Sequence, residues 1–233
     1  MPPSRVPDDS TVSPEPTPRA PDYGYSDSAI GFAHAYLWQP LRSILIREAP
    51  PPRRLFEIGC GNGATAHMLA QLGYDVSGID ASESGIRAAN KAYPELRLEV
   101  GSAYDDLAAR HGTFDVVVSL EVIEHLYAPR LFARVICDLM RPGALGVLSA
   151  PYHGYWKNLA IALANGFDRH LDPLWDGGHI KFWSRATLTR LLGEFGFTDL
   201  AFVRAGRVPL LAKSLIASCR TPPTAQACGS TRA

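Results

Sequence analysis

The amino-acid sequence predicts an α/β domain with a doubly wound, mostly parallel sheet. Short runs rich in Val, Ile and Leu alternate with segments of helical spacing, which is typical of βαβ units. The composition of the runs predicts strands that are covered on both faces. They comprise residues 55–58, 75–79, 96–100, 114–119 and 144–149. A glycine-rich turn follows the first run, at the strand end where such folds bind ligands.

The segments between these runs carry the signals of helices. Their apolar side chains recur every three or four residues, so one face of each is expected to pack on the sheet. These segments are residues 64–72, 84–92 and 128–140. Arg141-Pro142-Gly143 should stop the third helix, and Ser184 should cap a further helix that ends at Gly196. Two late strands are predicted near residues 200–204 and 214–220.

The length of 233 residues, of which 46% are hydrophobic, suits one substantial core. Residues 1–22 hold seven of the 19 prolines, which predicts a disordered tail, and residues 221–233 have a similar composition. One domain is therefore expected over residues 23–220. Its predicted parts are an N-terminal cap (23–53), a ligand-binding core (54–150), an insertion (151–183) and a C-terminal helix with strands (184–220).

The charge balance argues against nucleic acid as a partner. Lys and Arg total 23, and Asp and Glu also total 23, so no overall positive field attracts phosphates. No apolar run is long enough to span a bilayer, and the polar N-terminus does not resemble a signal peptide. Membrane contact is expected to be peripheral at most, and the predicted location is cytoplasmic. The four cysteines lack the spacing of a zinc site.

The glycine-rich turn predicts a nucleotide-like ligand, and its neighbours narrow the choice. Gly59, Gly61 and Ala64 satisfy a dinucleotide-binding pattern, which alone is weak. Glu57, however, ends the preceding strand, where a carboxylate would repel a pyrophosphate but attract an ammonium. Asp80 ends the next strand and can accept hydrogen bonds from a ribose diol. S-adenosylmethionine fits these two carboxylates, because it has both a ribose and an α-amino group. NAD remains the alternative ligand.

These motifs, in their order along the chain, resemble those of a known family. The motifs are Glu57-Ile58-Gly59-Cys60-Gly61-Asn62-Gly63, Asp80, residues 114–119 and Arg141-Pro142-Gly143. Together they are similar to the successive motifs of the class I S-adenosylmethionine-dependent methyltransferases. Glu121-Val122-Ile123-Glu124-His125-Leu126 resembles the branch that includes the ubiquinone-biosynthesis O-methyltransferases. The resemblance implies a Rossmann-like seven-stranded sheet with an antiparallel last strand.

The resemblance also implies a set of cofactor-binding positions. The glycines of the turn would line the methionine and ribose parts of the cofactor, and Asp80 would hold the ribose hydroxyls. Ser102 stands where many family members have an Asp for the adenine amino group, so Ser102 or the amide of Ala103 would replace it. The full predicted set is Glu57, Gly59, Cys60, Gly61, Asn62, Gly63, Asp80, Ala81, Ser102, Ala103 and Glu121.

Three side chains after the fourth strand suggest where the methyl acceptor binds. If the backbone there is helical, Glu121, Glu124 and His125 share one face. As the resemblance implies, they could hold a divalent cation, and an oxygen-rich set favours Mg²⁺. The alternative is that both carboxylates are solvated and His125 packs under the cofactor. Glu121 is also a predicted catalytic residue.

Residues 151–183 predict an acceptor pocket or lid, because aromatic side chains gather there. They include Tyr152, Tyr155, Trp156, Phe167, Trp175, Phe182 and Trp183. The alternative is that these rings only form the insertion's own small core. His153 is the predicted general base, since it follows the fifth strand, whereas His170 and His179 are expected to make structural hydrogen bonds. Residues 29–46 are expected to cover the cofactor as a helix that Pro40 kinks or ends.

The sequence therefore predicts an S-adenosylmethionine-dependent methyltransferase that acts on a small molecule. The expected reaction is O-methylation of a hydroxylated aromatic or a quinol. An NAD-dependent oxidoreductase and a methyltransferase-fold protein without turnover are the alternatives, because a fold does not fix the reaction.

Overall fold

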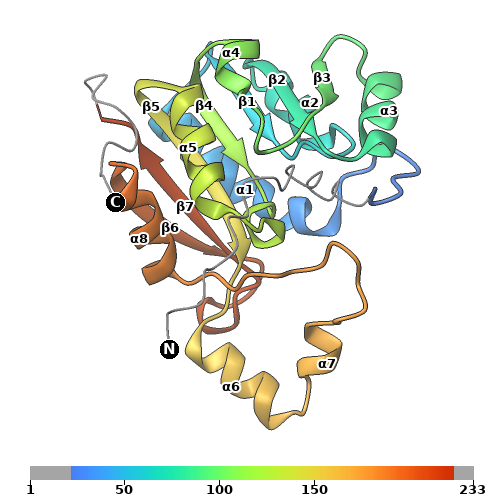
Figure 1. Cartoon of the computed structure of the whole chain (residues 1–233), viewed down its shortest axis with the longest axis vertical. Coiled ribbons are helices and arrows are strands. Elements are labelled where there is room, and N and C mark those ends of the chain that lie inside the picture. Colours follow the sequence, from blue (N-terminus) through green and yellow to red (C-terminus); the bar gives the residue numbers. More distant parts are fainter. Residues whose placement is uncertain (1–21, 223–233) are drawn as a thin grey trace, which may run out of the picture.

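The computed structural model describes residues 22–222 and shows a seven-stranded sheet between two helical layers (Figure 1). The strand order is β3-β2-β1-β4-β5-β7-β6. The strands are β1 (Arg54–Ile58), β2 (Asp75–Asp80), β3 (Arg97–Val100), β4 (Phe114–Ser119), β5 (Met140–Pro151), β6 (Thr198–Ala205) and β7 (Ser214–Arg220). Strands β1 to β5 pair in parallel, whereas β7 runs antiparallel to both of its neighbours. The predicted fold class, with its antiparallel last strand, is confirmed.

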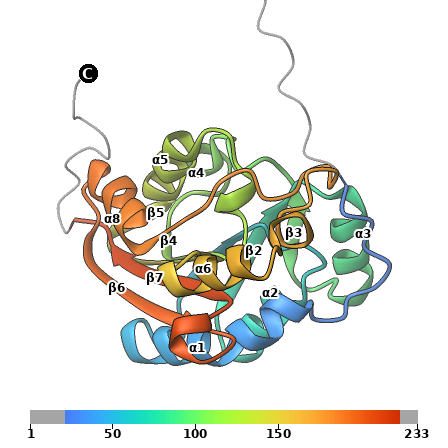
Figure 2. The ribbon, with the colours of Figure 1, turned by 90° about the horizontal axis from the view of Figure 1, so that it is seen from below.

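Helices cover both faces of the sheet and create two apolar cores. On one face lie α1 (Phe32–Glu48), α2 (Ala64–Gln71) and α3 (Glu83–Ala92), and on the other α4 (Leu107–His111), α5 (Pro129–Leu139) and α8 (Arg185–Glu194) (Figure 2). Strand residues alternate between the two cores, so that Leu55 faces the first group of helices and Phe56 the second. This burial on both faces explains why the strand residues are mostly apolar.

The strand order reverses between β1 and β4, which fixes the place of the site. Open parallel sheets bind ligands at the carboxyl ends of the strands on either side of such a reversal. The turn after β1, Asp80 at the end of β2 and Glu121 after β4 all lie at this edge. A short 3₁₀ helix, η1 (Ile123–His125), follows Glu121.

The insertion after β5 lies at the same edge. Its ends are joined by a parallel bridge between Tyr152 and Trp183. It contains α6 (Tyr155–Leu163) and α7 (Phe167–His170), which extend beyond the body of the domain at the bottom of Figure 1. No residue of α6 is buried. A second 3₁₀ helix, η2 (Pro209–Leu211), packs beside α6.

Three boundaries differ from the sequence-based expectations. Strand β5 begins at Met140, so Arg141-Pro142-Gly143 lies within a strand whose register against β4 shifts between Phe114 and Val116. Helix α1 continues through Pro40. Thr221, expected in a tail, is buried and its hydroxyl donates to the Arg141 carbonyl over 2.6 Å. Of the predicted tails, 1–22 and 221–233, residues 1–21 and 223–233 lie outside the described residues, whereas Asp22 accepts a hydrogen bond from Ser82.

Within residues 22–222, no helix combines the length and the apolar character needed to cross a membrane.

The cap of α8 offers a test of local stability. The Ser184 hydroxyl accepts from the Thr187 backbone N–H over 3.2 Å, while the Thr187 hydroxyl accepts from the Ser184 N–H over 2.9 Å. Ser184→Ala should therefore lower the free energy of unfolding by about 0.5–2 kcal/mol in urea denaturation. Ser43→Ala, on the exposed face of α1, is the matched control and should change it little. Equal effects of the two variants would contradict this assignment.

Candidate active site

The turn between β1 and α2 is built from glycines that other residues could not replace without strain. Gly59, Gly61 and Gly63 have φ angles of +81°, +53° and +78°. A Cβ atom at Gly59 would lie 2.3 Å from Val122 Cγ2, so the turn packs directly against the segment after β4. Gly63 caps α2 without a side chain of its own, and the Asn62 amide oxygen accepts from the Ala64 backbone N–H over 3.4 Å.

Asp80 holds this turn in position. Its Oδ2 accepts from the Gly61 backbone N–H and its Oδ1 from the Ser82 N–H, both over 2.7 Å. Burial raises the pKa of Asp80, although these two hydrogen bonds oppose the rise. A carboxylate oxygen has a second lone pair, so Asp80 can still accept from a ribose hydroxyl.

Glu57 is fully buried beneath the turn with no compensating partner. Among the described residues, neither carboxylate oxygen has a hydrogen-bond donor. Burial, and to a smaller extent the charge of Asp80, raises the pKa of Glu57 to about 8. An unpaired buried carboxylate is costly, and a ligand ammonium would remove that cost. The residues present therefore fit a cofactor with an amino group beside a ribose.

The other predicted cofactor positions have more local roles. The side chain of Cys60 belongs to the core that faces α2, so only its backbone faces the turn. The Asn62 amide donates to the carbonyls of Asp27 and Ala29 over 2.9 and 2.8 Å. The Ser102 hydroxyl accepts from the Tyr104 N–H over 3.2 Å, whereas Ala81 is exposed and Ala103 is half-buried. Their predicted contacts with a cofactor remain predictions.

The N-terminal segment before α1 lies across the turn, through contacts that the predicted cap at residues 23–53 did not specify. The Asp22 carboxylate accepts from both Ser82 and Ser84, and these bonds keep its pKa below the usual range. The Tyr25 hydroxyl lies so close to Gly61 that a Cβ there would be 2.8 Å away. The sequence feature in this segment is a Tyr-x-Tyr pattern in a polar stretch. It has no helix or strand periodicity that would indicate these contacts.

Glu121 lies in a strained backbone conformation and is tied to three elements. Its φ of +53° is rare for a residue with a side chain and is often found at functional sites. Ser149 on β5 donates to Oε1 over 2.7 Å, and Ser214 on β7 donates to Oε2 over 3.0 Å. The Tyr36 hydroxyl of α1 lies 2.7 Å from Ser214 Oγ and extends this network. The condition for the shared face is not met at Glu121, because the helical residues of this segment are 123–125.

Glu124 and His125 come together with His179, a histidine that was expected to be structural. One potential ligand atom of each residue lies within 4.8 Å of the other two. Glu124 is fully buried, so the alternative of a solvated carboxylate is wrong. Burial raises its pKa well above the usual value, and the nearby Glu121 adds to the rise. The sequence did not indicate that His179 joins this group, because it lies 54 positions after His125 in an irregular segment.

His153 lies at the start of the insertion, where its environment disfavours the protonated form. Its Nδ1 is 3.3 Å from Asn158 Oδ1, and its ring contacts those of His170 and Phe182. Burial, with the nearby Lys157 charge, lowers the pKa of His153 to about 4. It lines a pocket with Tyr152, Tyr155, Phe202 and Leu215, among others.

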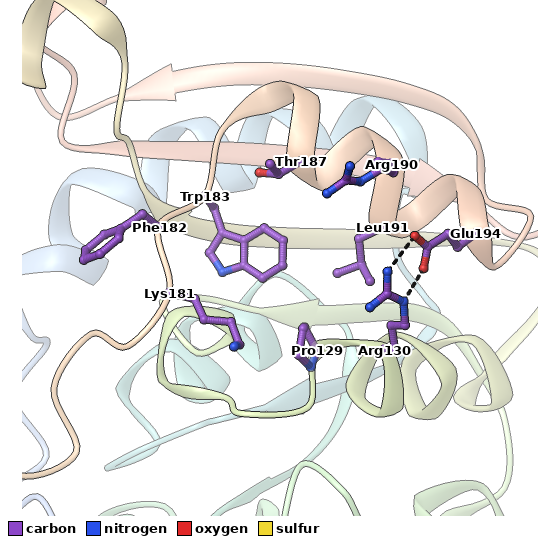
Figure 3. Close-up of a pocket in the computed structure, with 9 residues that line it drawn as sticks. All are labelled: Pro129, Arg130, Lys181, Phe182, Trp183, Thr187, Arg190, Leu191 and Glu194. Carbon is purple, nitrogen blue, oxygen red and sulfur yellow. Dashed lines mark hydrogen bonds and ion pairs between the residues drawn. The ribbon is translucent and has the colours of Figure 1, made fainter.

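A second cavity lies between α5, α8 and the end of the insertion (Figure 3). Trp183 and Leu191 form apolar walls, and Arg130 pairs with Glu194 through N–O distances of 2.6 and 3.0 Å. None of the predicted cofactor residues lines this cavity. It is therefore separate from the glycine-rich turn.

Comparison with known proteins identifies the family. Residues 32–201 match the family model described as "Methyltransferase domain". The chain belongs to this methyltransferase family. The motifs and the fold place it in the S-adenosylmethionine-dependent class I, near the ubiquinone-biosynthesis O-methyltransferases.

Sequence relatives agree with this placement. The chain is 36% identical to a ubiquinone biosynthesis O-methyltransferase of Caulobacter sp. (strain K31), with 56% of this chain and 59% of the relative covered. Identity to the Thiobacillus denitrificans protein of the same name is 29%, with 67% and 69% covered. The chain thus spans about three fifths of the length of the Caulobacter relative.

A solved structure shows the same fold with a bound ligand. The fold resembles a magnesium protoporphyrin IX methyltransferase of Synechocystis with bound S-adenosylhomocysteine. The TM-score is 0.64 at 19% identity, and 84% of this chain and 90% of the other are covered.

Glu57 should make the stability of the apoprotein depend on pH. Its folded-state pKa of about 8 lies above the value in an unfolded chain, so between these values the folded state binds more protons. Stability should therefore fall as the pH rises from about 5 to about 8. Glu57→Gln should flatten this dependence and raise the urea midpoint at pH 8. Glu99→Gln, at an exposed position, should keep the wild-type slope, and a wild-type slope in Glu57→Gln would show that Glu57 is not the titrating group.

Proposed function

We propose that this chain transfers the methyl group of S-adenosylmethionine to an oxygen of a small hydroxylated aromatic or quinol. The observation that carries the proposal is the buried, unpartnered carboxylate of Glu57 beneath the glycine-rich turn, beside Asp80. A carboxylate at this place favours an ammonium and disfavours a pyrophosphate. The names of the sequence relatives support oxygen as the methylated atom.

The turn and its neighbours bind and orient the cofactor. When bound, S-adenosylmethionine supplies a methyl group that is already activated by the sulfonium. Glu57 would pair with the α-ammonium and Asp80 would accept from the ribose. Gly59, Gly61 and Gly63 let the turn adopt its positive φ angles and pack closely against neighbouring side chains, since no Cβ projects from them. The chain then mainly has to hold the acceptor in line with the methyl group at about 3–3.5 Å.

Two side chains are proposed to take the proton from an acceptor hydroxyl. Burial raises the pKa of Glu121, which makes it a stronger base than an exposed carboxylate, while the Ser149 and Ser214 hydroxyls fix its orientation. His153 is neutral above its pKa of about 4 and is therefore free to accept a proton, but it is a weaker base. Glu121 is accordingly the main candidate and His153 the second.

The insertion supplies an aromatic environment for the acceptor. Trp156, Phe167, Trp175 and Phe182 are between 45% and 57% exposed, which is unusual for aromatic side chains that only form a core. Pockets for small aromatic ligands are lined by such rings together with a few placed polar groups. Their exposure therefore favours an acceptor pocket over the interpretation that these rings only form the insertion's own small core.

Asp80 allows a direct test of the cofactor assignment. Asp80→Asn should weaken binding of S-adenosylhomocysteine by about 1.5–3 kcal/mol, because hydrogen bonds to a charged acceptor are lost. Isothermal titration calorimetry measures this change. Asp75→Asn, at the exposed start of the same strand, should bind like the wild type. Unchanged affinity in Asp80→Asn would refute the ribose contact.

Methyl transfer itself is tested with labelled S-adenosylmethionine and a panel of catechols, phenols and quinols. Glu121→Gln should lower turnover by about 10²–10⁴-fold and leave the affinity for S-adenosylhomocysteine nearly unchanged. His153→Gln should have a smaller effect, and Glu99→Gln should have none. Full turnover in Glu121→Gln would contradict the role of this carboxylate, and reduction of NAD by the same substrates would favour the oxidoreductase alternative.

A further inference from the structure

The cavity between α5, α8 and the end of the insertion, here called the α5–α8 cavity, has no part in the proposed methyl transfer. Its volume is about 320 Å³, which lies within the usual range for small-molecule sites. Trp183 and Leu191, which are 7% and 5% exposed, form its inner wall (Figure 3). Pro129 and Phe182 extend this wall, so the inner part of the cavity is apolar and partly aromatic.

The charged side chains around this wall are mainly basic. Arg130 and Glu194 satisfy each other through two N–O contacts of 2.6 and 3.0 Å. Within residues 22–222, neither the Lys181 ammonium nor the Arg190 guanidinium makes a hydrogen bond or an ion pair. In Figure 3 these two side chains lie on either side of the Trp183 ring. The cavity thus holds two cations without a direct counterion.

This combination of walls and charges favours an organic anion as the ligand. Among the described residues, Glu194 is the only carboxylate that lines the cavity, and Arg130 already occupies both of its oxygens. A guanidinium binds a carboxylate through two parallel hydrogen bonds, and an ammonium adds a third donor. The apolar wall offers a bare inorganic anion nothing, whereas a ring can pack against Trp183.

The aromatic wall is held in place before any ligand binds. The Trp183 indole N–H donates to the Ile123 carbonyl over 3.3 Å, and the Trp183 backbone forms the parallel bridge to Tyr152. The Lys181 backbone N–H donates to the Glu124 carbonyl over 3.1 Å. Both carbonyls belong to η1, so residues 181–183 cannot collapse into the cavity without breaking these bonds. A preformed wall lowers the ordering cost of binding.

We propose that the α5–α8 cavity is a second ligand site, which binds a small aromatic carboxylate. The ring would pack against Trp183 and Leu191, and the carboxylate would accept from Arg190 and Lys181. The site is separate from the glycine-rich turn and does not rest on the proposed function. Because its occupant contacts residues 181–183, which hydrogen-bond to η1, it should also stabilise the end of the insertion.

The test measures binding of 1-naphthoate to the whole chain by isothermal titration calorimetry. Arg190→Gln and Lys181→Gln should each weaken binding by about tenfold, because each removes a charged hydrogen-bond donor. Arg185→Gln is the matched control, since Arg185 lies on the same helix but lines the neighbouring pocket beside Phe202. It should bind 1-naphthoate like the wild type.

A neutral analogue separates the role of charge from that of the apolar wall. 1-Naphthalenemethanol has the same ring system and no charge, so it should bind about tenfold more weakly than 1-naphthoate. Equal affinities for the two compounds would overturn the assignment of Lys181 and Arg190. No binding of 1-naphthoate to the wild type would overturn the site itself.

Hydrogen exchange locates the bound compound. 1-Naphthoate should slow amide exchange in peptides that cover residues 181–194 and leave those that cover residues 55–64 unchanged. Loss of binding in Arg185→Gln but not in Arg190→Gln, with protection at residues 152–155, would place the ligand in the neighbouring pocket and refute the proposal.

S-adenosylhomocysteine binding is measured on the same samples. Retained binding in Arg190→Gln and Lys181→Gln shows that these variants are folded, so that weaker binding of 1-naphthoate can be attributed to the missing donor. Failure of the wild type to bind S-adenosylhomocysteine while it binds 1-naphthoate would refute the proposed function but not the second site.

Discussion

The carboxylate of Asp80 is the constraint on which the site depends. By accepting from the Gly61 and Ser82 backbone N–H groups, it fixes the turn after β1 relative to the end of β2. The turn also packs against Val122 through Gly59, and so sets the position of the segment that carries Glu121 and Glu124. The N-terminal segment attaches to the same place through Asp22 and Asn62. The glycine-rich turn, the segment after β4 and the N-terminal segment thus share one anchor.

Two buried carboxylates without hydrogen-bond partners lie near this edge of the sheet. Glu57 and Glu124 are both fully buried and lack hydrogen-bond partners within the described part of the chain. At Glu57, a ligand ammonium would remove the cost of the buried carboxylate to the folded apoprotein. Such stored cost is common at functional sites, where a ligand converts it into binding free energy. Glu121 differs, because two serine hydroxyls already satisfy it.

Much of the fold was predictable because its signals are local. Apolar runs, helix periodicity and the Ser184 cap each lie within one element, and the elements they predicted are present. The glycine turn with Glu57 and Asp80 was predictable because its residues follow consecutive strands. The place of His179 and the individual contacts of the N-terminal segment were not predictable, since they arise from hydrogen bonds between irregular segments, such as that from Tyr23 to the Gly177 carbonyl. The conformation of Glu121 was not predictable, because the spacing of residues 121, 124 and 125 allows a helix without requiring one, and the chain adopts a positive φ there.

Glu57 is proposed to select S-adenosylmethionine over a dinucleotide, whereas Asp80 would accept from the ribose of either ligand. The most direct measurement is the thermal unfolding of the purified chain with S-adenosylhomocysteine and, separately, with NAD or NADH. At about a hundred times its dissociation constant, a ligand that binds the native state adds roughly 2.7 kcal/mol of stability. We predict that S-adenosylhomocysteine raises the unfolding midpoint and that the dinucleotides do not. A midpoint raised by NAD and unchanged by S-adenosylhomocysteine would contradict the account.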